Sequence, residues 1–522
     1  MKTADGPVRG GKFQGERVML LSTQVDPDLN ESPDLRELRH RMAKPQRHRL
    51  LHGFPLAAAM PPAEALQPLG ALRFDETTGR GLLIGVLPHP FCNAALTGCG
   101  FCTFLHESYS AGRAAAVVEQ VVREIEVRID AEPTLQDRAV TALYFGGGTA
   151  NLTPPESFRV LCRRLNAVFD LSRAEVTLEG VPAYFVKRRP LLLEILREEI
   201  HARHFRVSMG IQTFDRERLR QMGRLAFGTR ETFHEVVELA HSLGMTASGD
   251  LLFNLPGHSL AEMCRDVQAA LAIGLDHLGL YHLVMFKGLG TAWSRDAALL
   301  ASLPSNDVAA DNWQRLRELL GASGFKQTTL TNFERAEFQD DPRRFVYEDG
   351  ACQPDRFEML GFGPAAISFA ADKNFRRALK TLNPDSSADY TAAVQRGGRV
   401  WDRGFRYETE DLRIFYLTRR LAALRIDRPA YRDRFADDAL ADFPREFEAL
   451  EAEQLVEVSG EAIRPTPRGM FYADSIAALL AFRRLRVFRQ RRLAASSLPP
   501  VRKAAAVQQQ PQDFNSNAFA FM

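Results

Sequence analysis

The chain has 522 residues, six cysteines and a formal net charge of +2, and 45% of its residues are hydrophobic and 25% charged. This is the composition of an ordinary globular protein, and it excludes a disordered chain, a fibre and a disulfide scaffold. Basic residues are spread along the chain and balanced by acids, so we expect no nucleic-acid partner. The sequence has no run of 18 apolar residues and no hydrophobic leader, so we expect a cytoplasmic protein without a membrane partner.

The pattern along the chain predicts four parts. Residues 1–75 are rich in charge and proline and form an N-terminal extension. Residues 76–375 alternate apolar runs with amphipathic helical patterns and form the main domain. Residues 376–487 indicate helices and one short hairpin, which is typical of a small winged-helix-like domain. Residues 488–522 are rich in Ala, Ser, Pro and Gln, and we expect them to be disordered.

Seven apolar runs predict the strands of the main domain. They are Leu82–Leu87, Val140–Phe145, Glu175–Glu179, Phe205–Ile211, Met245–Phe253, His277–Leu283 and Phe325–Thr331. Amphipathic helices are predicted between them, among others over 155–169, 190–202, 230–243, 259–273 and 307–322. This alternation favours a parallel α/β sheet, either open or closed into a barrel. Such folds carry their chemistry at the C-terminal ends of the strands.

Three of the six cysteines lie close together, directly after the first predicted strand. Cys92, Cys99 and Cys102 have the spacing C-x6-C-x2-C. Three thiolates in one loop can bind a metal centre. A zinc ion needs a fourth ligand, which His106 or His89 could supply. A [4Fe–4S] cluster held by three cysteines leaves one iron open for a substrate or cofactor. The remaining cysteines are expected only to pack; they are Cys162, Cys264 and Cys352.

Polar residues follow the ends of the next strands. The turn Gly146–Thr149 has the sequence Gly-Gly-Gly-Thr, which is either a tight turn or a place where a ligand approaches the backbone closely. Glu179 ends the third strand, where it is either a site carboxylate or a helix cap. Gln212, Arg224 and Asp250 lie at or just after the ends of the fourth and fifth strands. We therefore expect these side chains to face one shared site.

Together these motifs resemble the radical S-adenosylmethionine (SAM) superfamily, and within it the branch of oxygen-independent coproporphyrinogen III oxidase. The resemblance covers about residues 80–485. Besides the cysteine loop and the Gly-Gly-Gly-Thr turn, it includes Ser208–Gln212, Asp250–Gly257 and Gly361–Ser368. It implies a partial (β/α)6 TIM-type barrel followed by a helical, winged-helix-like domain.

The resemblance also implies the cofactors and their ligands. The three clustered cysteines would ligate a [4Fe–4S] cluster whose fourth iron has no protein ligand, so His106 is expected not to bind it. SAM would lie beside the cluster, as one molecule or two. The residues that the resemblance places at SAM are Phe101 at the adenine, Gly147, Gly148 and Thr149 at the methionine amino group, Glu179, Gln212, Arg224 and Asp250 at other polar atoms, and Ile367 through its backbone.

The implied activity is reductive cleavage of SAM to a 5′-deoxyadenosyl radical, which abstracts a hydrogen atom from an unactivated carbon. Methyl or methylene transfer to an organic substrate is the preferred reaction. The alternatives are oxidative decarboxylation of a porphyrinogen-like side chain and a non-catalytic haem chaperone. The expected partners are a small-molecule substrate and an electron donor such as flavodoxin or ferredoxin. The residues that act on the substrate cannot be named from the sequence.

The chain also departs from the family pattern at three places. The first cysteine gap is six residues where the superfamily usually has three. Val86 and Pro88 stand where the porphyrinogen oxidases have Tyr and His, which disfavours porphyrinogen decarboxylation. The stretch Phe345–Gln353 replaces the H-N-x-x-Y-W segment of the haem-chaperone subgroup, which disfavours that role.

Overall fold

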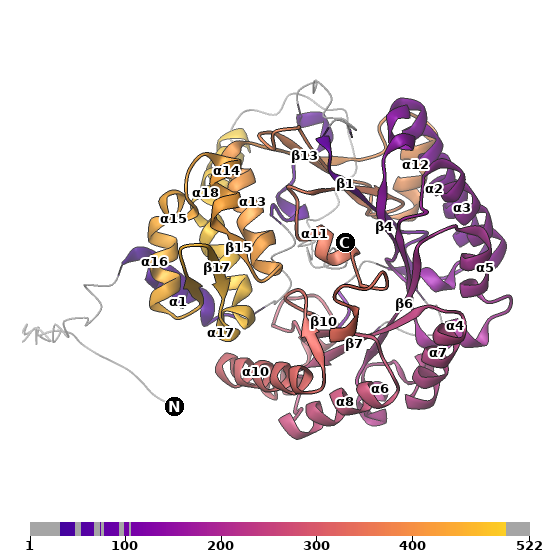
Figure 1. Cartoon of the computed structure of the whole chain (residues 1–522), viewed down its shortest axis with the longest axis horizontal. Coiled ribbons are helices and arrows are strands. Elements are labelled where there is room, and N and C mark those ends of the chain that lie inside the picture. Colours follow the sequence, from indigo (N-terminus) through magenta and orange to yellow (C-terminus); the bar gives the residue numbers. More distant parts are fainter. Residues whose placement is uncertain are drawn as a thin grey trace, which may run out of the picture.

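The centre of this computed structural model is one sheet of 12 strands, in the order β14-β13-β12-β11-β1-β4-β5-β6-β7-β8-β10-β9. The structure describes residues 32–46, 54–66, 74, 78–92, 99–103 and 106–496. The sheet curves into an incomplete barrel with helices around its outside (Figure 1). None of the helices in these described ranges is long and apolar enough to span a membrane.

Six neighbouring strands run parallel and form the barrel proper. They are β1 (Gly81–Val86), β4 (Val140–Phe145), β5 (Glu175–Gly180), β6 (His204–Gln212), β7 (Thr246–Phe253) and β8 (His277–His282). Each agrees with a predicted strand to within one residue at either end. The expected partial (β/α)6 barrel is therefore confirmed.

Helices cover the outer face of these strands, as Figure 1 shows on the side of α2, α3, α5 and α7. The main ones are α2 (Ala111–Ala131), α3 (Pro155–Val168), α4 (Pro182–Lys187), α5 (Leu192–Glu199), α6 (Arg216–Gln221), α7 (Arg230–Ser242), α8 (Leu260–Ala272) and α10 (Asn306–Ala322). Ser259 begins α8 with a full capping box, in which its side chain and that of Glu262 each accept from the other's backbone. Apolar faces such as that of Val117, Val121 and Ile125 then pack on the sheet.

The sheet extends beyond the parallel strands at both edges. At the β8 edge, β10 (Asn332–Arg335) and β9 (Phe325–Gln327) form an antiparallel hairpin. The predicted strand Phe325–Thr331 is thus too long, because the chain turns at Thr328, whose N–H donates to the Asn332 carbonyl at 2.9 Å. The sequence of this segment does not reveal the turn, because it contains neither Gly nor Pro, the residues that usually mark turns.

At the other edge, β11 (Phe357–Phe362) pairs parallel with β1. The antiparallel strands β12 (Ile367–Ala371), β13 (Ala378–Leu382) and β14 (Arg403–Tyr407) follow, with α12 (Ser387–Arg396) inserted between the last two. The main sheet therefore continues past the predicted domain boundary at 375. Backbone pairing across β12, β13 and β14 joins these residues to the barrel.

The C-terminal domain has a three-stranded antiparallel sheet in the order β15-β17-β16, flanked by helices. Its elements are α13 (Thr409–Ala422), β15 (Ile426–Asp427), α14 (Arg428–Phe435), α15 (Ala439–Asp442), α16 (Pro444–Ala452), β16 (Val456–Val458), β17 (Ala462–Pro465), α17 (Pro467–Phe471) and α18 (Ala473–Ser496). This order of helices and wing strands fits the expected winged-helix-like domain. Because α18 runs to Ser496, disorder does not begin at 488 as expected; residues 497–522 lie outside the described part.

A helix from the N-terminal part, α1 (Pro33–Met42), lies beside α16 in Figure 1. Two ion pairs join it to the C-terminal domain: Arg39 to Glu453 at 2.6 Å and Arg483 to Asp34 at 3.2 Å. The C-terminal end of α1 contacts Asn306 of α10, whose side-chain amide donates to the Met42 carbonyl at 2.6 Å. The N-terminal part thus connects the C-terminal domain with the barrel.

The strands β5, β6 and β7 alternate between apolar outward and polar inward residues. On β5, Val176 and Leu178 belong to the main apolar core, whereas Glu175, Thr177 and Glu179 occupy the alternate positions. The same period of two recurs on the neighbouring strands, with inward residues such as Arg206, Ser208, Ser248 and Asp250. The part of the interior lined by these three strands is consequently polar, whereas Leu83 of β1 and Tyr144 of β4 belong to an apolar cluster.

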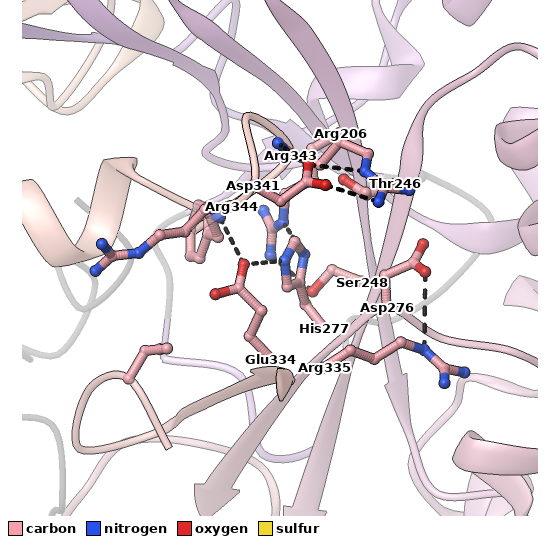
Figure 2. A network of polar contacts seen from close by, with 12 residues as sticks. Arg206, Thr246, Ser248, Asp276, His277, Glu334, Arg335, Asp341, Arg343 and Arg344 are labelled. Atoms are coloured by element: carbon pink, nitrogen blue, oxygen red, sulfur yellow. Dashed lines mark hydrogen bonds and ion pairs between the residues drawn. The ribbon is translucent and has the colours of Figure 1, made fainter. Parts of the chain in front are cut away.

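Arg206 organises the N-terminal end of this interior (Figure 2). Its guanidinium donates to Ser248 Oγ at 2.7 Å and to His277 Nδ1 at 3.2 Å, and it lies 3.7 Å from the centre of the Phe345 ring. Since Nδ1 accepts, His277 carries its proton on Nε2 and donates it to Glu334 at 2.6 Å. Burial lowers the pKa of His277, which keeps the ring neutral.

The short helix α11 (Tyr347–Ala351) lies inside the ring of strands (Figure 1). The N–H groups of Val346 and Tyr347 donate to the buried Glu175 carboxylate at 2.8 and 3.2 Å. The Tyr347 ring lies 4.9 Å from that of Tyr144 on β4. These contacts fill the N-terminal end of the barrel, so its C-terminal end is the place for the candidate site.

Candidate functional site

The cysteine loop leaves the barrel at the C-terminal end of β1. A parallel pair of two-residue strands, β2 (Phe91–Cys92) and β3 (Glu107–Ser108), joins its two ends. Between them, Cys99 and Cys102 form a turn in which the Cys102 N–H donates to the Cys99 carbonyl at 3.0 Å. All three sulfur-bearing residues are half-buried free cysteines. Residues 93–98, within the six-residue gap, lie outside the described part.

Two of the cysteine sulfurs receive hydrogen bonds from other strand ends. Thr149, in the turn after β4, donates its hydroxyl to Cys92 Sγ at 3.3 Å. Arg224, in the loop after β6, donates to Cys99 Sγ at 3.1 Å and is itself held by the Gly210 carbonyl at 2.6 Å. Hydrogen-bond donors of this kind, outside the ligand set, typically orient the ligands of a metal site.

The glycine turn after β4 packs tightly on protein atoms. A Cβ on Gly147 would lie 2.7 Å from the Leu87 side chain, and one on Gly148 would lie 2.9 Å from the Phe91 carbonyl oxygen. The space that these glycines leave free is thus taken by the segment leading to the first cysteine. The glycines bring Thr149 close to Cys92; their contact with the methionine amino group stays a prediction.

Glu179 on β5 and Asp250 on β7 face the barrel interior with β6 between them, where Glu179 pairs with Ser208 and Asp250 with Gly210, two residues further along. Tyr144 donates its hydroxyl to Glu179 Oε2 at 3.1 Å. Burial, followed by the charge of Asp250, raises the pKa of Glu179 to about 8. The Asp250 carboxylate covers Gly279 of β8, where a Cβ would lie 2.4 Å from its Oδ1. Glu179 is therefore a neutral hydrogen-bonding group at pH 7, close to the carboxyl group of Asp250.

This pKa predicts how stability depends on pH. The folded state holds the Glu179 proton more tightly than the unfolded chain, so its stabilising contribution is full below pH 4.5 and is lost as the pH rises towards 8. We expect the Tm of wild type to fall relative to that of Glu179→Gln between pH 5 and 8. Differential scanning calorimetry at several pH values measures this difference. The exposed Glu119→Gln on α2 serves as the control and should follow wild type; equal pH slopes for Glu179→Gln and wild type would refute the assignment.

The remaining predicted site residues lie around this centre. Gln212 ends β6 with a φ of +72°, and a Cβ on Gly210 would lie 2.7 Å from its amide nitrogen and 3.0 Å from an Arg224 nitrogen. Gln212 and Arg224 thus meet at Gly210. Phe101 is half-buried in an apolar cluster with Trp293, 6.0 Å from its ring. Ile367 begins β12, where its carbonyl lies over Gly361.

The possible metal ligands near the cysteine loop differ in their surroundings. Over the described ranges, no group of three His, Cys, Asp or Glu side chains could hold one metal ion. His106 is exposed, and His89 is fully buried, where it accepts the Phe91 N–H at 3.3 Å. A [4Fe–4S] cluster binds its thiolates through different irons, so its ligands are spread apart. Three half-buried thiols in one loop, two of them facing hydrogen-bond donors, fit this group.

Sequence reasoning missed two residues of this region. Tyr144 faces the same interior as Glu179, and its place two residues before the glycine turn on an alternating strand could have indicated this. Trp293 lies against the cysteine turn, where its backbone N–H donates to the Gly100 carbonyl at 2.9 Å. It comes from a loop almost 200 residues further along the chain, so no local pattern predicts the contact.

Comparison with known proteins agrees with this geometry. The family model described as the radical SAM superfamily matches residues 86–270. The heme chaperone HemW of Lactococcus lactis is 24% identical over 290 residues, which are 55% of this chain and 69% of that protein. The heme chaperone HemW of Mycobacterium tuberculosis is 27% identical over 417 residues, which are 77% and 95% of the two chains. Five further curated relatives are matched over 51 to 64% of their own length.

The fold is that of a solved structure as well. Coproporphyrinogen III oxidase (HemN) from Escherichia coli superposes with a TM-score of 0.66 at 20% sequence identity, covering 85% of this chain and 98% of that one. The family match runs from the last residue of β1 through the cysteine loop into α8, and the fold match covers a larger share of the chain. Residues 86–270 therefore match the radical SAM superfamily, and the chain shares its fold with coproporphyrinogen III oxidase.

Proposed function

We propose that Cys92, Cys99 and Cys102 hold a [4Fe–4S] cluster and that the protein cleaves SAM reductively beside it. When bound, the cluster passes one electron to the sulfonium of SAM, whose C–S bond then breaks to give methionine and a 5′-deoxyadenosyl radical. The observation that carries the proposal is the pair of hydrogen bonds on the cysteine sulfurs, from Thr149 to Cys92 and from Arg224 to Cys99.

The other strand-end residues have tasks that follow from their positions. Arg224 offers a positive charge between Cys99 and Gly210, where it also faces the end of β6 and its Gln212. Glu179, kept neutral by burial, offers a hydroxyl donor, while Asp250 beside it offers an acceptor. Such a mixed set suits the hydroxyl, amine and carboxylate groups of SAM. A flavodoxin- or ferredoxin-type protein would supply the electron.

The fate of the radical separates the candidate reactions. Methyl or methylene transfer to an organic substrate is the reaction that the sequence favours, and no contact in the described residues bears on it further. Anaerobic incubation of reconstituted, reduced protein with SAM tests the proposal by product analysis. 5′-Deoxyadenosine should form, and S-adenosylhomocysteine beside it would favour transfer. Full cluster occupancy without 5′-deoxyadenosine would exclude the proposed cleavage.

Haem trafficking is the second candidate, because curated relatives are named heme chaperones, one of them matched over 95% of its length. The stretch that replaces the H-N-x-x-Y-W segment is largely buried here: Phe345 is 8%, Tyr347 4% and Cys352 0% exposed. A haem titration followed by its Soret band tests this candidate. Saturable binding of one haem per chain would support this candidate. A Soret band that changes no more than in a titration of buffer without protein would exclude it.

A further inference from the structure

The turn between the last two cysteines is held from both sides at Gly100. Its N–H donates to the Met222 carbonyl, 3.3 Å away in the loop after α6. Its carbonyl accepts the backbone N–H of Trp293 at 2.9 Å, from the loop after β8. The backbone between Cys99 and Cys102 is therefore fixed between two loops that follow different strands.

The indole of Trp293 also lies directly on Gly100. A Cβ on Gly100 would lie 2.2 Å from the indole Nε1 and 2.3 Å from Cδ1, which is far inside van der Waals contact. The next residue, Phe101, approaches the same ring with a centroid distance of 6.0 Å. The indole of Trp293 can thus occupy this place only because residue 100 has no side chain.

Trp293 cannot easily move away, because it is anchored in an apolar cluster separate from the main core. It is 9% exposed, and it packs with Met222, Leu255 and Tyr281 among others. The helical turn η8 (Trp293–Arg295) and helix α9 (Ala297–Ala301) continue this covering segment. Half-buried residues of the cluster include Phe101 from the cysteine loop itself.

We infer that Trp293 is a positioning residue for the iron–sulfur cluster. It holds the turn that presents Cys99 and Cys102, and it covers this turn against solvent and oxygen. The apolar shell around a metal site controls the access of solvent to it. Removing a residue that contacts the ligands from outside typically lowers metal affinity about 10–100-fold. The inference rests on the proposed function, since it requires that these cysteines hold a cluster.

The test compares Gly100→Ala, Trp293→Ala and the double variant after anaerobic reconstitution. Iron per chain and the rate at which the visible cluster absorption decays in air are measured. We expect about tenfold faster decay in Trp293→Ala and about tenfold weaker iron retention in Gly100→Ala. The double variant should recover iron relative to Gly100→Ala, because the overlap is gone, while it still decays like Trp293→Ala. Such non-additivity is the signature of direct contact.

Two further variants separate positioning from general damage. Gly112→Ala on α2, where no atom lies within 4 Å of the added Cβ, should match wild type. Trp293→Phe keeps an aromatic cover without the indole nitrogen edge and should restore most of the air stability. If the cluster in Trp293→Ala decays in air at the wild-type rate, or if the two substitutions have additive effects, this inference is overturned while the proposed function stands. A wild-type chain that takes up no cluster would overturn the proposed function and this inference with it.

Discussion

Replacing Cys92, Cys99 or Cys102 singly by Ala should abolish the iron–sulfur centre. Each thiolate is expected to bind a different iron, so the loss of one should weaken cluster binding by more than the roughly 10–100-fold that loss of an outer partner costs. Iron and sulfide per chain after anaerobic reconstitution should fall to background in all three variants. The visible absorption of the cluster should vanish with them, and SAM cleavage should stop.

The chain supplies its own matched control for these variants. Cys264 on α8 is also half-buried and free, but it packs on the outer core rather than at the strand ends. Cys264→Ala should retain full iron. If instead Cys102→Ala keeps its iron while Cys264→Ala loses it, the cysteine loop is not the ligand set.

Removing Arg206 should have the largest effect on stability. Arg206→Met would leave His277, Ser248 and Thr177 without their donor, in an interior that also contains buried carboxylates. Breaking a buried charged network typically costs about 3–5 kcal/mol. We expect the Tm to fall by roughly 3–5 °C, measured by calorimetry on the whole chain.

An exposed arginine provides the comparison. Arg315 on α10 pairs only with Glu318 on the surface, at 3.2 Å, and Arg315→Met should change the free energy of unfolding by less than about 0.5 kcal/mol. Equal Tm values for Arg206→Met and Arg315→Met would show that the network in Figure 2 does not hold the barrel together.

The barrel could be predicted because its sequence signals are local. Each of the six parallel strands is a short segment with apolar residues on at least one face, and helices with a clear apolar face, some of them capped as by Ser259, separate the strands. Parallel strands bring their C-terminal ends to one edge, so strand-end residues such as Glu179 and Asp250 could be expected to meet. Their electrostatic coupling in the structure agrees with that expectation.

The rest depends on contacts between distant segments. No local signal shows that the sheet continues through β12 to β14, or that α1 pairs with the C-terminal domain through Asp34 and Arg39. The close packing at the glycine turn is of the same kind, since the space beside Gly147 is filled by Leu87 from another strand end. Trp293 reaches Gly100 from almost 200 residues away. Such pairings are set by tertiary packing, which a single sequence does not report.

The most direct test of the account is the electron paramagnetic resonance spectrum of the reduced cluster with and without SAM. If Cys92, Cys99 and Cys102 leave one iron open, SAM should change the spectrum of the wild-type protein. The Cys264→Ala control should show the same change, and Cys99→Ala should show no cluster signal at all. A fully loaded, reduced wild-type cluster whose spectrum does not respond to saturating SAM would contradict the account.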